Sequence, residues 1–129
     1  MPTRAYTQAL KQLRSICLAL PEAVEVEAWG HPTFRAGKKM FAGFGEYEGA
    51  ISLAWKAGFE RQDELLKDPR FYPTPYAARQ GWVSLRLDKN TNWDEVTGLL
   101  HDAYCQVANK RMIKALESAN QDARKKFKS

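Results

Sequence analysis

Residues 29–42 read Trp29-Gly-His-Pro-Thr-Phe-Arg-Ala-Gly-Lys-Lys-Met-Phe-Ala42, and this stretch predicts the first hairpin of an antiparallel sheet. Gly30 and Pro32 mark its entry, and Ala36-Gly37-Lys38 contains its turn, because Gly and Pro interrupt regular structure where a chain reverses. The residues before this hairpin indicate a helix and a short leading strand. The residues after it return strands to the same sheet and end with a helix.

The register of the hairpin depends on the length of its turn. A two-residue turn would place Phe34 opposite Phe41, whereas a three-residue turn places Phe34 on the face of Met40 and Ala42. The next hairpin, with residues 46–49 as its loop, makes the Met40 and Ala42 face the core, so we predict the three-residue turn. The predicted inward set is Phe34, Met40, Ala42, Phe44, Ile51, Leu53, Trp55, Val83, Leu85 and Leu87.

Helical periodicity flanks the predicted sheet. Thr3 can cap a first helix that Pro21 ends, and residues 24–28 alternate as a half-buried strand. After the strand of residues 50–55, residues 59–67 predict a short helix. Residues 70–81, with two prolines and three aromatic residues, predict an ordered loop, and 82–87 a last strand. Asn92 caps a long final helix, with Glu95 completing a start that resembles a capping box.

The fold class is therefore α+β: one domain with an antiparallel sheet of about five strands packed against N- and C-terminal helices. A chain of 129 residues can bury one core of this kind. We place the domain at residues 1–117 and a basic, flexible C-terminal tail at 118–129. Residues 1–105 carry 13 Lys and Arg and 13 Asp and Glu, so the net charge of +5 arises entirely from residues 106–129.

Several classes of site lack their sequence signatures. Cys17 and Cys105 lie among apolar neighbours in separate helical patterns, which favours reduced core thiols over a disulfide or a metal pair. The glycines at 37, 43, 45, 49 and 58 are interpreted as turns and bulges, without a phosphate-binding Gly pattern. No cofactor and no metal are expected. No apolar run suits a membrane span or a secretion signal, so we expect a cytoplasmic protein that does not contact membranes.

Six short sequence motifs, taken in their order along the chain, resemble those of the MmcQ/YjbR family of small bacterial proteins. They are Leu20-Pro21-Glu22, Trp29 to Arg35, Lys39 to Ala42, Asp68-Pro69-Arg70-Phe71, Pro75-Tyr76 and Gly81-Trp82-Val83. The likeness covers about residues 4–110. It implies a compact α+β domain similar to the CyaY-like, "double wing" DNA-binding architecture. It implies no established enzyme activity, and DNA binding follows from it only by analogy of fold.

The outer face of the predicted sheet suggests where nucleic acid could bind. Aromatic side chains interleaved with Arg and Lys can contact bases or sugars while the cations neutralise phosphate. We predict phosphate contacts from Arg35, Lys39 and Arg86, and a packing platform of Trp29, Phe41 and Trp82. The alternative is an ordinary face, with its aromatics packed under residues 70–81 and Arg35 or Arg86 paired with Glu25 or Glu27.

The leading hypothesis is a non-enzymatic DNA-binding module. A protein-interaction adaptor is the alternative, because clustered exposed aromatic residues also mark protein interfaces. A small enzyme is a third reading, centred on His31, which could meet Tyr76 or Asp68 if the proline-rich loop folds over the hairpin. A hydrogen-bonding role for His31 at the strand entry is the simpler interpretation, and His101 is expected to face solvent or to lie beside a helix cap.

Overall fold

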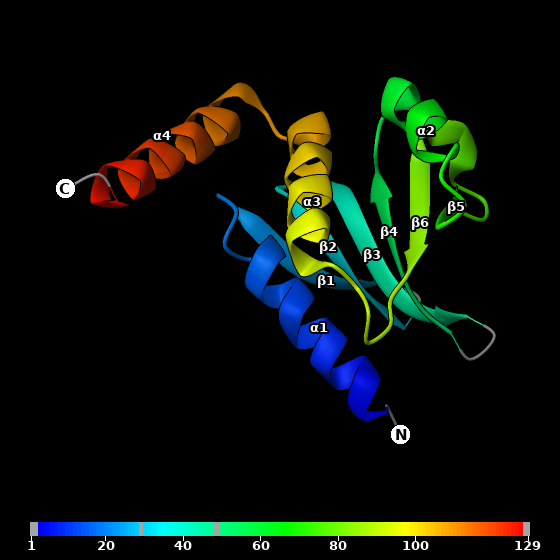
Figure 1. Cartoon of the computed structure of the whole chain (residues 1–129). Coiled ribbons are helices and arrows are strands. Elements are labelled where there is room, and N and C mark those ends of the chain that lie inside the picture. Colours follow the sequence, from blue (N-terminus) through cyan, green and yellow to red (C-terminus); the bar gives the residue numbers. More distant parts are fainter. Residues whose placement is uncertain (1–2, 29, 48–49, 128–129) are drawn as a thin grey trace.

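The computed structural model describes residues 3–28, 30–47 and 50–127, which form an antiparallel sheet with helices (Figure 1). The elements follow in the order α1 (Arg4–Cys17), β1 (Ala23–Ala28), β2 (His31–Ala36), β3 (Lys39–Tyr47), β4 (Ala50–Lys56), α2 (Phe59–Leu65), β5 (Phe71–Pro73), the 3₁₀ turn η1 (Ala78–Gln80), β6 (Trp82–Arg86), α3 (Trp93–Val107) and α4 (Lys110–Phe127). The α+β class and the single sheet are as predicted.

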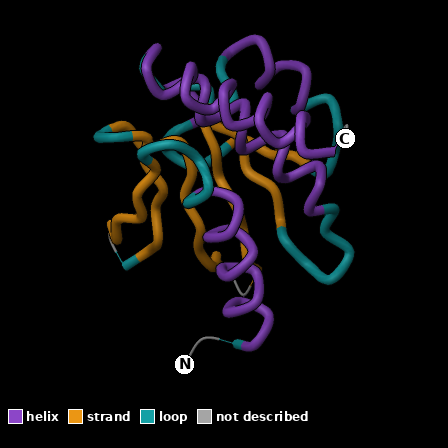
Figure 2. The backbone as a smooth tube through the Cα atoms, turned by 90° about the vertical axis from the view of Figure 1, so that its left-hand side faces the viewer, coloured by secondary structure: helices purple, strands orange, loops and turns teal. Residues whose placement is uncertain are grey.

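The sheet has six strands in the order β1-β2-β3-β4-β6-β5, with antiparallel neighbours throughout. Helices α1 and α3 lie on one face (Figure 1), and in the view turned by 90° α1 runs from the marked N-terminus alongside the strands (Figure 2). The main core fills the space between. We call the sheet surface turned away from α1 and α3 the outer face. No described helix is long and apolar enough to cross a membrane.

The first hairpin has a shorter turn than predicted. Ala36 pairs with Lys39, so only Gly37 and Lys38 lie in the turn, and the predicted three-residue turn was wrong. The register shifts between Phe34 and Arg35, which pair with Ala42 and Met40. A bulge at this point supplies the extra residue that we assigned to the turn. Phe34 therefore reaches the core as predicted.

The bulge moves Phe41 to the opposite side from the one predicted. Phe41 is fully buried, and its ring contacts the ring of Tyr104 from α3 edge-on, with the centroids 5.7 Å apart. An alternating strand would have placed it on the outer face with Arg35. Met40, predicted inward, instead lines a groove on the outer face.

The segment predicted as an ordered loop holds two short elements. β5 adds the sixth strand by pairing Phe71 with Leu85 and Pro73 with Val83. The chain then forms η1 before it enters β6. Gln62 of α2 donates hydrogen bonds from Nε2 to the carbonyl oxygens of Ala78 (2.7 Å) and Trp82 (3.1 Å). These contacts fix the segment between β5 and β6 against α2.

The predicted long final helix is two helices. Ala108 adopts an extended conformation (φ −68°, ψ 147°), and the side chain of Asn109 accepts a hydrogen bond from the Met112 amide at 2.9 Å. Asn109 therefore acts as an N-cap, which favours ending α3 and starting a new helix. α4 extends to Phe127 through residues for which we predicted a flexible tail. The domain boundary at residue 117 stays a prediction.

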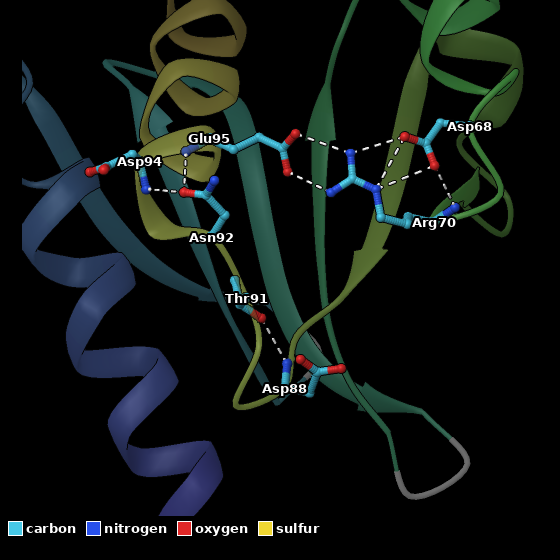
Figure 3. Close-up of polar contacts among 7 residues, drawn as sticks. All are labelled: Asp68, Arg70, Asp88, Thr91, Asn92, Asp94 and Glu95. Carbon is cyan, nitrogen blue, oxygen red and sulfur yellow. Dashed lines mark hydrogen bonds and ion pairs between the residues drawn. The ribbon is translucent and has the colours of Figure 1, made fainter.

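Both predicted N-caps are confirmed. Thr3 accepts a hydrogen bond from the amide of Tyr6, and Asn92 accepts from the amides of Asp94 and Glu95. The Glu95 carboxylate does not close a capping box. It binds the guanidinium of Arg70 at 2.9 and 3.1 Å, and the same guanidinium also binds Asp68 (Figure 3). Arg70 thus ties the start of β5 to the first turn of α3.

Candidate functional site

A groove of about 730 Å³ crosses the outer face of the sheet. It lies over β2, β3, β4 and β6, and the chain around residues 74–80 borders it on one side. Its volume falls within the range of about 300–1,000 Å³ that is typical of ligand sites in proteins. The sheet forms the floor, so this is the surface on which the sequence placed its candidate site.

The floor of the groove is made of small residues. Gly43 and Gly45 alternate along β3, and Ser52 and Ala54 lie beside them on β4, where Gly43 pairs with Ala54 and Gly45 with Ser52. A Cβ atom added to Gly43 would meet nothing within 4 Å. The two glycines are strand residues, not the turns or bulges that the sequence suggested. Their spacing of two is the signal that could have revealed an open strip on one face.

His31 forms one wall of the groove. It pairs with Ala28 at the start of β2, and its Nδ1 would lie 2.9 Å from a Cβ added to Gly45. The imidazole therefore lies directly over the Gly45 backbone, and only a glycine at that position leaves room for it. The position of the His31 ring therefore explains why residue 45 is a glycine.

The opposite wall is the segment of residues 74–80. The hydroxyl oxygens of Thr74 and Ser84 are 2.9 Å apart, and the Ser84 side chain is buried. Gln62 fixes the other end of the segment through the two hydrogen bonds described above. Trp82 of β6 also lines the groove and is only 6% exposed. The wall is therefore anchored at both ends before any ligand arrives.

Tyr76 lies at the rim of the groove with its side chain fully exposed. Its backbone has φ +66°, a left-handed conformation that non-glycine residues adopt at a cost of about 1 kcal/mol or more. The ring thus makes no contribution to the core although the backbone is held in a strained conformation.

Positive charge is concentrated near one end of the groove. Lys39 begins β3 and Lys56 ends the antiparallel β4, so both lie at the same end of the sheet. Arg35 lies opposite Met40 beside them, and among the described residues its buried Nε has no hydrogen-bond partner. Glu46, near the other end, is the one acidic side chain among the described lining residues.

The predicted site residues are only partly brought together. Lys39 lines the groove, Arg35 lies next to it, and Arg86 is exposed at the end of β6. Of the predicted aromatic platform, Phe41 lies in the core, and Trp82 is on the outer face but only 6% exposed. Trp29 lies outside the described residues. Lys56 and Tyr76 were not among the predicted site residues.

Ion pairs engage several other arginines away from the groove. Arg14 of α1 binds Glu25 of β1 at 2.7 Å, so Glu25 does not pair with Arg35 or Arg86 as the alternative interpretation proposed. The hydrogen bonds from Arg14 hold the pKa of Glu25 below its usual value. In the same way, the hydrogen bonds from Arg70 lower the pKa of Asp68.

Metal-binding side chains do not gather in the described part of the chain. There, no group of three or more His, Cys, Asp or Glu side chains could hold a metal ion. Both cysteines are free thiols, but only Cys17 belongs to the core as expected, and Cys105 is exposed. Burial is the main reason that the pKa of the Cys17 thiol rises to about 12.

Comparisons with known proteins give a family and a fold. The family model described as YjbR matches residues 18–106. The crystal structure of the Deinococcus radiodurans protein DR2400, with the domain DUF419, is similar at a TM-score of 0.69 and 24% identity over 84% of this chain and 87% of that one. A Pseudomonas syringae protein aligns at a TM-score of 0.64 and 16% identity, over 82% and 99% of the two chains. No curated protein matches significantly.

Proposed function

The chain belongs to the YjbR family, and from this premise and the groove on the outer face we propose that it is a non-enzymatic DNA-binding module. The observation that carries the proposal is the charge of the groove. Lys39 and Lys56 share one end of it, Arg35 lies opposite the lining residue Met40, and Glu46 is the one acidic residue in the described lining. Cations that converge on one open surface suit a phosphate backbone.

The proposal changes the roles of the residues that the sequence suggested. Arg35, Lys39 and Arg86 keep their phosphate contacts, and Lys56 joins them. Phe41 and Trp82 are buried, so the aromatic side chain that contacts DNA is Tyr76 at the rim. The basic tail adds charge without providing the site.

The test is fluorescence anisotropy with labelled DNA at two salt concentrations. The four phosphate contacts predict that binding weakens roughly 50- to 150-fold between about 50 and 200 mM salt, because counterions are released on association. The double variant Arg35→Ala and Arg86→Ala should bind DNA more weakly than the wild type at the same salt concentration, and its binding should be less sensitive to salt. Circular dichroism of the variant controls for folding. An affinity that neither salt nor this pair of substitutions alters would remove the groove from the account.

We propose binding and not catalysis because the described residues of the groove hold no assembled acid–base pair. His31 and Tyr76 both line the groove, but Asp68 is bound to Arg70. Among the described residues no carboxylate hydrogen-bonds His31, and a catalytic histidine is usually oriented by such a partner. A broad hydrolase, phosphatase and transferase screen of the wild type beside His31→Ala checks this. Turnover present in the first and absent from an equally folded second would contradict the proposal.

A protein-interaction adaptor is the second candidate, and the exposed edge of the sheet favours it. β1 is an edge strand, and its Val24 and Val26 side chains are 44% and 38% exposed. Such an edge can accept an extended segment of another protein as an added strand. Light scattering after size exclusion, and pull-down after nuclease treatment with Val26→Lys as the control, distinguish this function from DNA binding. If the wild type and Val26→Lys recover the same proteins, the edge strand β1 is not the interaction site, which argues against the adaptor function.

A further inference from the structure

We propose that the groove selects unpaired nucleic acid over duplex and that Tyr76 stacks on a base of the bound strand. This inference rests on the proposed function and adds the class of nucleic acid and the residue that recognises it. Its basis is the combination of an exposed aromatic ring, a small-residue floor and cations confined to one end.

The floor suits the face of a base better than a phosphate group. The backbone groups of β3 and β4 are engaged in the sheet ladder, so the floor around Gly43 and Ala54 offers few free donors to an anion. A phosphate buried there would lose its hydration without receiving hydrogen bonds in exchange. A flat ring has no such requirement, and the missing side chain at Gly43 lets it approach the strands closely.

Tyr76 is placed to cover a base that enters the groove. Its side chain projects from the rim and is fully exposed, so no intramolecular packing must be broken before it stacks. The wall that carries it is fixed by the Thr74–Ser84 hydroxyl contact and by the hydrogen bond from Gln62 to the Ala78 carbonyl. A strained backbone conformation held by its surroundings is a common feature of ligand-contacting positions.

The cations complete the geometry of a single strand. Lys39 and Lys56 lie at one end of the groove, where they can neutralise the phosphates that flank the stacked base. In a duplex the base faces are stacked on each other and are not available to Tyr76. A duplex would therefore present charged phosphates to the apolar floor, while a single strand can direct its bases to the floor and its phosphates to the lysines.

Fluorescence anisotropy with a labelled oligothymidine, a duplex of the same length and the matching oligouridine tests the inference. The wild-type protein should bind the single-stranded DNA at least tenfold more tightly than the duplex. Tyr76→Ala should weaken single-strand binding by about 5- to 150-fold, the range expected for loss of one stacked base, and Tyr76→Phe should restore it because the ring remains. Phe59→Ala removes another exposed ring, 66% exposed at the start of α2, and should have no effect.

The outcomes separate this inference from the proposed function. Salt-sensitive binding that is equal for duplex and single strand, or that Tyr76→Ala leaves unchanged, overturns the inference and leaves the DNA-binding proposal standing. Absence of binding to every nucleic acid overturns both. Tighter binding of oligouridine than of oligothymidine supports the single-strand inference and identifies RNA, not DNA, as the preferred source.

Discussion

Individual side chains in this protein experience very different surroundings, and the two cysteines illustrate the range. Cys17 lies in the core with its thiol fully buried, whereas Cys105 is exposed on α3. Because the thiolate is the reactive form, a buried thiol whose pKa is raised to about 12 should resist modification at neutral pH. The environment, and not the residue type, decides which cysteine can react.

Titration with a disulfide reagent at about pH 8, below the usual thiol pKa of about 8.5, should therefore modify one thiol per native chain. In denaturant both thiols should react, and Cys105→Ser should abolish the native reaction. Rapid modification of two thiols in the folded protein would contradict the burial of Cys17. Circular dichroism before and after modification checks that the reagent has not unfolded the chain.

Local chemistry explains which residues were predictable. Thr3 and Asn92 were assigned correctly because an N-cap depends on the residue and on the amides within three positions of it. Phe41 was misplaced because a bulge in β3 reverses the alternation, and the packing against Tyr104 that accompanies it comes from a distant helix. The exposure of Tyr76 depends on how residues 74–80 are anchored, and its neighbours in the sequence do not reveal this.

The elements of the fold are tied together by polar contacts at their ends, and the contact between α1 and β1 is a clear case. Arg14 and Glu25 form a bidentate pair that joins the helix to the edge strand. The folded-state pKa of Glu25 is lowered, so the pair contributes stability above the usual Glu value of 4.5. That contribution is lost as the pH falls through the lower, folded-state pKa.

Glu25→Gln should therefore lower the free energy of unfolding at pH 7, and the difference from the wild type should shrink as the pH falls below about 5. Chemical denaturation at a series of pH values measures this. Glu27→Gln alters an exposed carboxylate in the same strand and should have little effect. A deficit for Glu25→Gln that grows towards low pH would have the wrong sign for this account.

The central strand β3 has glycines at the floor of the groove, and their missing side chains leave the space that the groove occupies. Gly43→Val adds a side chain where a Cβ meets nothing within 4 Å, so the sheet can accept it without strain. We expect an unfolding midpoint equal to or above that of the wild type, because glycine weakens a strand. DNA binding should fall by about tenfold or more, a loss of ~1.4 kcal/mol, because the valine fills the floor.

Thermal melting and DNA anisotropy of this variant give the two readouts. Gly45→Val serves as the contrast, because its Cβ would collide with His31 Nδ1 at 2.9 Å and should disturb the wall itself. A stable Gly43→Val protein that binds DNA as the wild type does would place the ligand elsewhere.

The order of elements was largely predictable because periodicity and turn residues act along the sequence. The hairpins, the strand of residues 82–87 and the first helix follow from such patterns. The break between α3 and α4 was missed although Asn109 is a strong N-cap, because apolar spacing continues across it to Met112 and Leu116. β5 was missed because its three residues are too few for a periodic pattern, and pairing with β6 alone defines it.

For the molecule as a whole, the distribution of charge decides where a polyanion can bind. The net charge of +5 arises from residues 106–129, yet the groove lies on the outer face of the sheet and has its own cations. Leu116 of α4 is buried against the domain, and residues 117–121 are exposed. The two basic regions therefore make separable contributions.

Truncation after Glu117 should leave a folded protein that still binds DNA. The affinity should fall modestly, since the removed Arg124, Lys125, Lys126 and Lys128 act through charge alone. The remaining binding should still respond to Tyr76→Ala. Complete loss of binding on truncation, in a protein that still unfolds in one cooperative transition, would assign the site to the tail.

The most direct test of the groove as the DNA site compares two double variants with equal change in charge. Lys39→Ala with Lys56→Ala removes both lysines of the groove, and Lys67→Ala with Lys114→Ala removes two exposed lysines that do not line it. Anisotropy over a salt series should show that the first pair weakens DNA binding and lowers the slope of log affinity against log salt by about 1.4–2, while the second leaves both unchanged. Equal effects from the two pairs would contradict the assignment of the groove as the DNA-binding site.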